Sequence, residues 1–169
     1  AVNGKLDQLS YLLTASYEEN GVQRDAQGDI LGLQYGLSDS ETQNYFTKLT
    51  YDFDDEKQLQ FSYNFYSSQQ KTDLGDVTGD GNIGEKTYAI HVPLALQKQG
   101  KPQGPEGNKN ITLKYVDYAL FENTQMTLDL YKQNIENVFF FSTALANLDE
   151  GYSGGQSVIK SDKQGARAT

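Results

Sequence analysis

Apolar and polar side chains alternate along five stretches of the chain, and this period of two is that of a β-strand. In residues 8–17 the odd positions are all apolar or aromatic, whereas Leu12 is the one apolar residue at the even positions. The same alternation recurs in residues 44–53, 58–67, 110–119 and 125–133. No stretch keeps a helical i, i+3, i+4, i+7 stripe for three turns. The pattern therefore predicts an all-β protein whose strands each have one apolar and one polar face.

The connections between the strands are of two kinds. Tight turns are expected around residues 54–57 and 122–124, whereas residues 18–43, 67–109 and 142–156 form long polar segments rich in Gly, Asp, Gln and Ser. Since short and long connections alternate, the long ones should gather at one end of an antiparallel up-and-down sheet. The six expected strands are residues 5–17, 43–53, 57–68, 110–120, 125–141 and 157–169.

Two architectures fit this pattern. A partial transmembrane β-barrel, with long outer loops and short periplasmic turns, accounts for strands of 11 residues or more, because a tilted strand needs about 9–11 residues to span the hydrocarbon. Tyr17, Tyr45, Tyr51 and Tyr115 lie near the strand ends, as in an interfacial aromatic girdle. A soluble, secreted or surface β-sandwich that acts as a binding module would show the same alternation, and it is the alternative.

Composition narrows the function classes. The 169 residues suffice for one domain, and the absence of Cys excludes disulfides and Cys-ligated metal centres. The net charge of −9 argues against a nucleic-acid partner, because phosphate binding needs a basic face. Twelve Tyr and eight Phe are too many for a disordered acidic chain. With a single His, His91, no catalytic set can be assembled, so an enzyme is not expected.

Three segments resemble the barrel of TonB-dependent outer-membrane receptors, particularly the ferric-siderophore branch. They are "YLLTASYEENGVQRDAQGD" (11–29), "NYFTKLTYDFDDEKQLQFSYNFYSSQQ" (44–70) and "SVIKSDKQGARAT" (157–169). The hairpin "KLTYDFDDEKQLQFSYNFY" carries the resemblance best. A strand that ends in Tyr-Asp-Phe, an acidic tight turn and a strand that opens Gln-Leu-Gln-Phe-Ser-Tyr are typical of that barrel.

The resemblance implies energy-coupled import of iron–siderophore complexes across the bacterial outer membrane. The partners it implies are the iron–siderophore ligand, outer-membrane lipid, and TonB reached through a plug domain. Six strands cannot close such a barrel, so residues 1–169 are expected to be a fragment of the barrel domain without the plug. No covalently bound cofactor is expected, because the iron–siderophore is the transported ligand.

The segment "GDVTGDGNIGE" (75–85) contains two motif-like spacings. Gly79, Gly81 and Gly84 form G-x-G-x-x-G, but a polar loop precedes it and no helix follows, so nucleotide binding is rejected. A calcium loop would need a bidentate acid at its twelfth position, which is Thr87 here. The remaining hypothesis is a loose Ca²⁺ site formed by Asp76, Asp80, Asn82 and Glu85. A solvated, turn-rich loop is the preferred interpretation.

The long connections are the expected recognition surface. Residues 18–43 carry six acids against Arg24, a net charge of −5. A ferric chelate requires stacking surface and hydrogen bonds, and aromatic or imidazole side chains in these segments can supply both. The candidate ligand-binding residues are Tyr35, Tyr88, His91 and Tyr152, each of which is equally explained as an ordinary loop residue.

Overall fold

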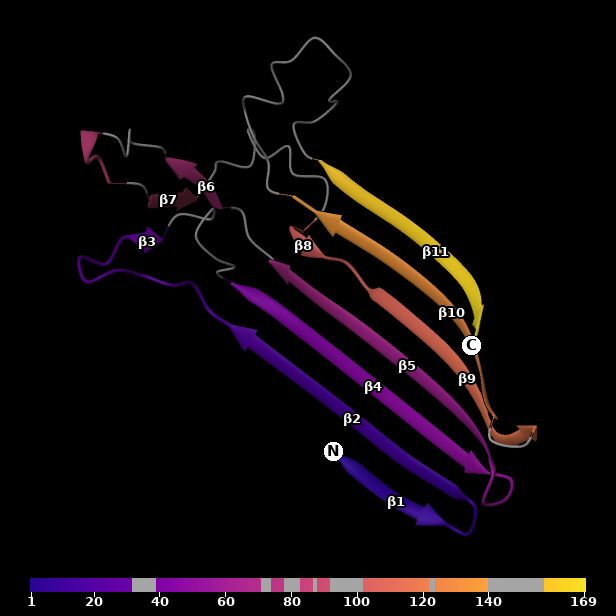
Figure 1. Cartoon of the computed structure of the whole chain (residues 1–169). Coiled ribbons are helices and arrows are strands. Elements are labelled where there is room, and N and C mark those ends of the chain that lie inside the picture. Colours follow the sequence, from indigo (N-terminus) through magenta and orange to yellow (C-terminus); the bar gives the residue numbers. More distant parts are fainter. Residues whose placement is uncertain are drawn as a thin grey trace.

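The computed structural model describes residues 1–31, 39–70, 74–77, 83–86, 88–91, 102–121, 124–139 and 157–169. These residues form one large antiparallel sheet and one small sheet (Figure 1). Within the described ranges there is no α-helix, and accordingly no helix long and apolar enough to cross a membrane. The prediction of an all-β, antiparallel fold is confirmed.

The large sheet follows the strand order β1-β2-β4-β5-β9-β10-β11, so each strand is hydrogen-bonded to the next long strand along the chain. Its members are β1 (Val2–Leu6), β2 (Leu9–Asn20), β4 (Ser40–Asp52), β5 (Lys57–Gln70), β9 (Asn108–Phe121), β10 (Thr124–Val138) and β11 (Val158–Ala168). β8 (Gly104–Pro105) lies off this path and pairs with β10. The sheet is not closed, because β1 and β11 pair on one side only.

Five of the six expected strands are confirmed with small shifts of their ends, whereas the strand expected over residues 5–17 is confirmed only from Leu9 onward, as β2, and is preceded by the separate strand β1. The chain reverses at Asp7 and Gln8, and β1 pairs with β2 so that Leu6 lies opposite Leu9. Asp7 has a φ of 50°, a left-handed conformation that the short polar side chain of Asp tolerates. The alternation of apolar and polar residues does not reveal this turn, because Leu6 and Leu9 share a face although they are three residues apart.

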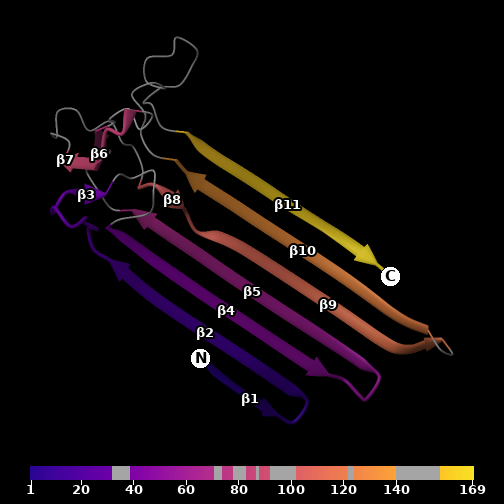
Figure 2. The same ribbon diagram turned by 60° about the vertical axis from the view of Figure 1, so that its left-hand side comes forward.

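The long connections also contain strands that the sequence pattern did not predict. β3 (Ile30–Leu31), β7 (Tyr88–His91) and β6 (Leu74–Val77) form the small sheet in the order β3-β7-β6. These strands have two to four residues, which is too short for alternation to be recognised. The small sheet lies at the end of the large sheet that borders the long connections (Figure 1, Figure 2).

Cross-strand register sorts the side chains of the large sheet into an apolar and a polar face. One row of directly opposed residues is Gly4, Tyr11, Leu49, Phe61, Leu113, Leu130 and Ala166. The neighbouring row, which points to the opposite side, is Lys5, Ser10, Thr50, Gln60, Lys114, Asp129 and Arg167. The apolar face is the side of the first row, and the polar face is the side of the second. The predicted alternation therefore extends across the whole sheet.

Polar side chains link the strands on the polar face. Asp52 accepts hydrogen bonds from Gln58 Nε2 (2.8 Å) and Lys5 Nζ (3.4 Å), and Arg167 Nη2 lies 2.9 Å from Asp129 Oδ2. Such exposed pairs each contribute well under about 1 kcal/mol to stability. They fix register and keep this face hydrated rather than forming a core.

The tight turn expected at residues 54–57 is confirmed, and Asp54 explains it. Its Oδ1 accepts hydrogen bonds from the backbone N–H of Glu56 (2.9 Å) and of Lys57 (2.8 Å). The N–H of Glu56 is the largest influence that lowers the pKa of this carboxyl. The turn expected at 122–124 joins Phe121 and Thr124, which lie opposite each other, and residues 122–123 lie outside the described ranges.

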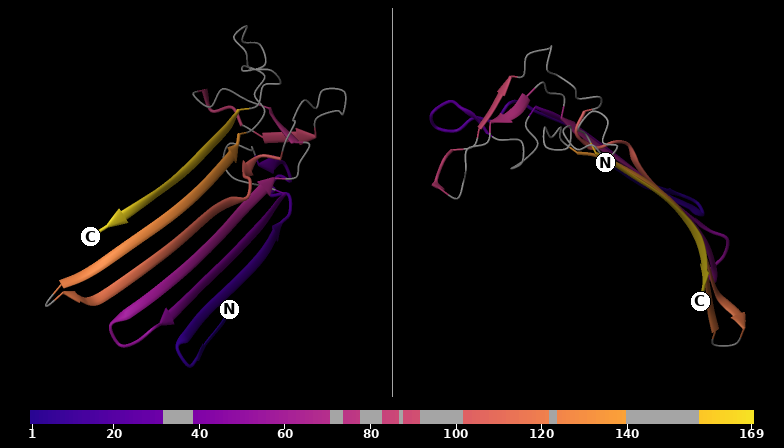
Figure 3. Two further views of the ribbon diagram at one scale, coloured as in Figure 1. Left: turned by 90° about the vertical axis from the view of Figure 1, so that its right-hand side faces the viewer. Right: turned by 90° about the horizontal axis from the view of Figure 1, so that it is seen from above.

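The large sheet is a single curved layer (Figure 3). Among the described residues the buried hydrophobic side chains are Ile30, Ala89, Val116 and Val138, of which the first two belong to the small sheet. Large apolar side chains of the apolar face remain exposed, including Leu13, Tyr45 and Leu130. No second layer of the described residues covers this face.

Among the described glycines, Gly104 lies closest to the backbone of another strand. Its φ is 118°, and a Cβ added there would lie 2.0 Å from the carbonyl oxygen of Ser68 on β5. The neighbouring Gln103 accepts a hydrogen bond from the N–H of Gln70 (2.8 Å), so the segment before β9 folds back onto β5. Only glycine fits this conformation at this distance.

We expect Gly104→Ala to lower the free energy of unfolding by about 2–4 kcal/mol, because it combines backbone strain with a steric clash. Gly28→Ala is the matched control: Gly28 also has a positive φ, 91°, but nothing lies within 4 Å of an added Cβ. It should cost only about 1 kcal/mol of strain. Urea denaturation followed by circular dichroism measures both, and equal losses would contradict the proposed clash.

Candidate functional site

The apolar face carries a band of apolar side chains with a sharp limit toward the long connections. On β2 the band runs from Leu9 to Tyr17 and is followed by Glu19 on the same face. On β10 it ends at Leu130 and is followed by Lys132. We call these side chains the apolar band. Its members are Val2, Leu6, Leu9, Tyr11, Leu13, Ala15, Tyr17, Tyr45, Leu49, Tyr51, Leu59, Phe61, Tyr63, Phe65, Ile111, Leu113, Tyr115, Met126, Leu128, Leu130, Ala166 and Ala168.

The limit of the apolar band does not follow a row of opposed residues. From β2 to β10 the last band residues are Tyr17, Tyr45, Phe65, Ile111 and Leu130, and the first polar residues beyond them are Glu19, Gln43, Ser67, Lys109 and Lys132. Leu130 lies in the same row of opposed residues as Tyr11, and Tyr11 is six residues from Tyr17 along β2. The limit therefore descends by six residues across the four strand-to-strand steps from β2 to β10.

This descent converts into an angle. A strand rises about 3.3 Å per residue and lies about 4.8 Å from its neighbour, so the limit is inclined by roughly 45° to the rows. On β11 the limit stays level with Leu130, at Ala166, and including this fifth step reduces the inclination to about 40°. The strands thus cross the apolar band at about 40–45° from the perpendicular.

The short-turn end of the sheet is staggered in the same direction. Lys57, the first residue of β5, lies opposite Asp117, and β9 continues four residues further to Phe121 before β10 returns. The β9–β10 hairpin therefore extends beyond the β4–β5 hairpin, as Figure 2 shows. The strand ends at the short turns are thus staggered in the direction in which the long-connection limit descends, as in the walls of barrels, where strand stagger and tilt are linked.

Aromatic rings concentrate at both limits of the apolar band. Tyr17 is 59% exposed and Tyr45 is 43% exposed at the long-connection limit, where the Tyr45 and Phe65 ring centroids lie 5.6 Å apart. At the short-turn limit the rings of Tyr51 and Phe53 meet edge to face at 5.0 Å. Tyrosine places an apolar ring on one side of an interface and a hydroxyl on the other.

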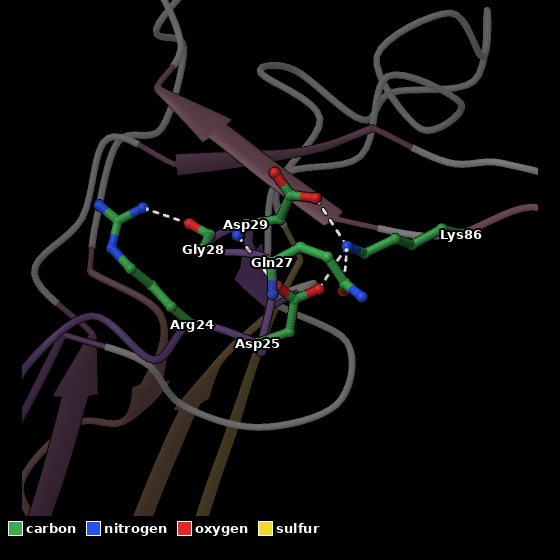
Figure 4. A network of polar contacts seen from close by, with 6 residues as sticks. All are labelled: Arg24, Asp25, Gln27, Gly28, Asp29 and Lys86. Atoms are coloured by element: carbon green, nitrogen blue, oxygen red, sulfur yellow. Dashed lines mark hydrogen bonds and ion pairs between the residues drawn. The ribbon is translucent and has the colours of Figure 1, made fainter.

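A second candidate site is the polar network that joins the small sheet to the segment before β3 (Figure 4). Lys86 forms ion pairs with Asp25 and with Asp29 (2.6 Å), and it donates a hydrogen bond to Gln27 Oε1 (3.2 Å). Arg24 Nη1 donates to the carbonyl oxygen of Gly28 (2.8 Å). Two connections more than fifty residues apart in sequence are thereby held together.

Hydrogen bonds make Asp25 the centre of this network. Its Oδ1 accepts the backbone N–H of Gln27 (2.9 Å) and of Asp29 (3.0 Å). The hydrogen bond from Lys86 is the main cause that lowers the pKa of the Asp25 carboxyl, and the same contact raises the pKa of Lys86. Because two carboxylates compensate the charge of Lys86, the network holds two connections together and is not an open anion site. We call the ion-paired residues Asp25, Asp29 and Lys86 the clip.

The small sheet brings together several of the candidate ligand and metal residues. Tyr88 is half-buried and lies opposite both Leu31 and Val77. The backbone of Asp76 lies opposite Ala89, and that of His91 lies opposite Leu74.

Glu85 is exposed beside Lys86, whereas Tyr35, Tyr152, Asp80 and Asn82 lie outside the described residues. In the described ranges no group of three or more His, Cys, Asp or Glu could hold a metal ion. The Ca²⁺ site and the ligand contacts therefore stay predictions.

Two features of these sites were not found from the sequence. The partners Asp25 and Lys86 lie in different polar segments, and no spacing rule connects residues so far apart. The descent of the band limit can be predicted from the sequence only in part. The last apolar residue of each strand is visible in the sequence, but which of these residues lie opposite one another depends on the register of strand pairing.

Neither a protein-family model nor a solved structure matches this chain. The resemblance to the receptor barrels therefore stays a prediction.

Acid should loosen the clip. The folded pKa of Asp25 lies below its unfolded value, so its contribution is complete at neutral pH and is lost as pH falls from about 4 through the folded pKa. The amide of Leu31, which donates to Gln23 (3.0 Å), should then exchange faster after correction for intrinsic rates. Asp25→Asn should remove this pH dependence, while the amides of β5 serve as the internal control. A pH-independent Leu31 amide in the unmutated chain would contradict the clip.

Proposed function

We propose that this chain forms part of the wall of an outer-membrane β-barrel, in a receptor of the TonB-dependent kind that takes up iron–siderophore complexes. The observation that carries the proposal is the inclined limit of the apolar band. Strands of outer-membrane barrels tilt by about 35–45°, so a horizontal bilayer crosses them obliquely. The inclination of about 40–45° derived from register agrees with that geometry.

The dimensions of the apolar band support lipid as its solvent. Along β2, where the band is longest, it extends from Leu9 to Tyr17, about 27 Å of strand at 3.3 Å per residue. Tilted by about 40–45°, this length corresponds to roughly 20 Å along the bilayer normal. The apolar belt of outer-membrane barrels is about 25 Å tall and is flanked by aromatic girdles, so the band on β2 covers most of this height. The tyrosines at both limits match such girdles.

The soluble β-sandwich binding module has weaker support. A sandwich buries the inner face of each sheet against a second sheet about 10 Å away. Here the large apolar side chains of the apolar band are exposed or half-buried, and none of the described residues forms a second sheet over them. The limit of the band would also have no reason to run obliquely across six strands.

The proposed receptor role assigns the two ends of the wall. The end that carries the small sheet and the long connections would face outward and contact the iron–siderophore, and the clip would hold these connections in place. TonB would act through a plug domain, and the protein would have no enzymatic activity and no nucleic-acid partner. Uptake of radiolabelled iron–siderophore by cells that lack the gene tests this role, and unchanged uptake would contradict it.

The membrane role is tested by a pair of single tryptophans, since the chain has no native Trp. Leu13 lies on the apolar face and Leu12 on the polar face, so Leu13→Trp and Leu12→Trp make the same change on opposite sides of β2. In vesicles with brominated acyl chains, Leu13→Trp should be strongly quenched and blue-shifted, because it faces lipid. Leu12→Trp should be quenched several-fold less, because it faces water. Equal quenching of the two variants, or none in either, would contradict the proposal.

A further inference from the structure

Two lysines lie immediately beyond the limit of the apolar band on β9 and β10. Lys132 follows Leu130 on the apolar face and lies directly opposite Ile111. Lys109 follows Ile111 on the same face and lies directly opposite Asn134. The two lysines are therefore diagonal neighbours, with α-carbons about 7–8 Å apart, which is within reach of two long side chains.

Both ammonium groups are available. The two side chains are exposed, and neither takes part in an ion pair or hydrogen bond within the described part of the chain. Lys160, which lies on the same face further from the apolar band, is paired with Glu136 (2.9 Å). By register, Asp162 is the diagonal neighbour of Lys132 and accepts a hydrogen bond from the neutral Asn134, and Glu136 is the diagonal neighbour of Lys109. The first position beyond the band on β9 and β10 thus carries two lysines that form no ion pair with the described residues.

This basic pair is local. At the corresponding position beyond the apolar band, β2 has Glu19, β4 has Gln43 and β5 has Ser67. The chain as a whole is acidic, with a net charge of −9. Two adjacent free lysines at this one level are therefore not a consequence of a generally basic surface.

We infer that Lys109 and Lys132 bind the phosphate of a lipid headgroup at the edge of the bilayer. The inference rests on the proposed membrane role of the apolar band. Lysine side chains at the end of a spanning segment extend toward the interface, where anionic headgroups lie. Below the lysines, Ile111 and Leu130 are exposed and offer apolar surface for the acyl chain of the same lipid.

The combination of an apolar lower half and a cationic upper half selects a phosphate-bearing lipid over free phosphate. Inorganic phosphate would contact the two ammonium groups but would gain nothing from Ile111 and Leu130. A lipid satisfies both halves with one molecule and is held at the correct depth by its acyl chains. The expected ligand class is therefore an anionic, phosphate-bearing lipid in the leaflet on the long-connection side.

The test uses Leu130→Trp as a reporter in the full chain, reconstituted in phosphatidylcholine vesicles. Brominated phosphatidylglycerol and brominated phosphatidylcholine are compared as quenchers at equal low fractions. The anionic lipid should be preferred about fivefold or more beside the intact lysines. The preference should disappear in Lys109→Gln with Lys132→Gln. It should persist in Lys163→Gln, which removes one exposed charge on the polar face of β11.

The outcomes separate this inference from the proposed function. Equal quenching by both lipids with the lysines intact would overturn the lipid site while leaving the membrane role in place. No quenching by either lipid would overturn both. Abolition of the preference by excess inorganic phosphate, but not by sulfate at the same ionic strength, would show a free-phosphate site and would also overturn the inference.

Discussion

The continuous antiparallel register of the large sheet is the constraint on which the rest of the structure depends. Hydrogen bonding decides which residues are opposed, and the period of two then decides which side chains share a face. A slip of one residue in any strand would move all its band residues to the polar face. The apolar band, its inclined limit and its basic pair exist only because six strand pairings hold the same register.

The inclined limit connects this register with a function. If the first polar residues beyond the apolar band all lay in one row of opposed residues, they would indicate only that this end of the sheet is exposed to water. A limit that descends with the strand stagger indicates a plane that cuts tilted strands, which is how a bilayer meets a barrel wall. The exposure of the apolar face, the aromatic rings at both limits and the two free lysines agree with the same plane.

The sequence predicted the strands well wherever alternation lasts for ten residues or more, as in β4 and β5. It failed at Asp7, where a left-handed residue makes a hairpin without the usual Gly or Asn-Gly signal. It also missed β3, β6, β7 and β8, which are shorter than any recognisable period. The clip of Asp25 and Lys86 was beyond its reach, because long-range contacts follow from the fold and not from local spacing.

The most direct measurement follows depth along a single row of the sheet. Leu13, Thr47, Ile111 and Gln164 share one row of the apolar face. Because the chain has no native Cys, spin labels can be attached after the single changes Leu13→Cys, Thr47→Cys, Ile111→Cys and Gln164→Cys.

In vesicles, accessibility to oxygen should fall, and accessibility to a water-soluble nickel chelate should rise, in that order, over a depth of about 15 Å. Equal depths at all four positions, or water at every one, would contradict a tilted wall in a bilayer.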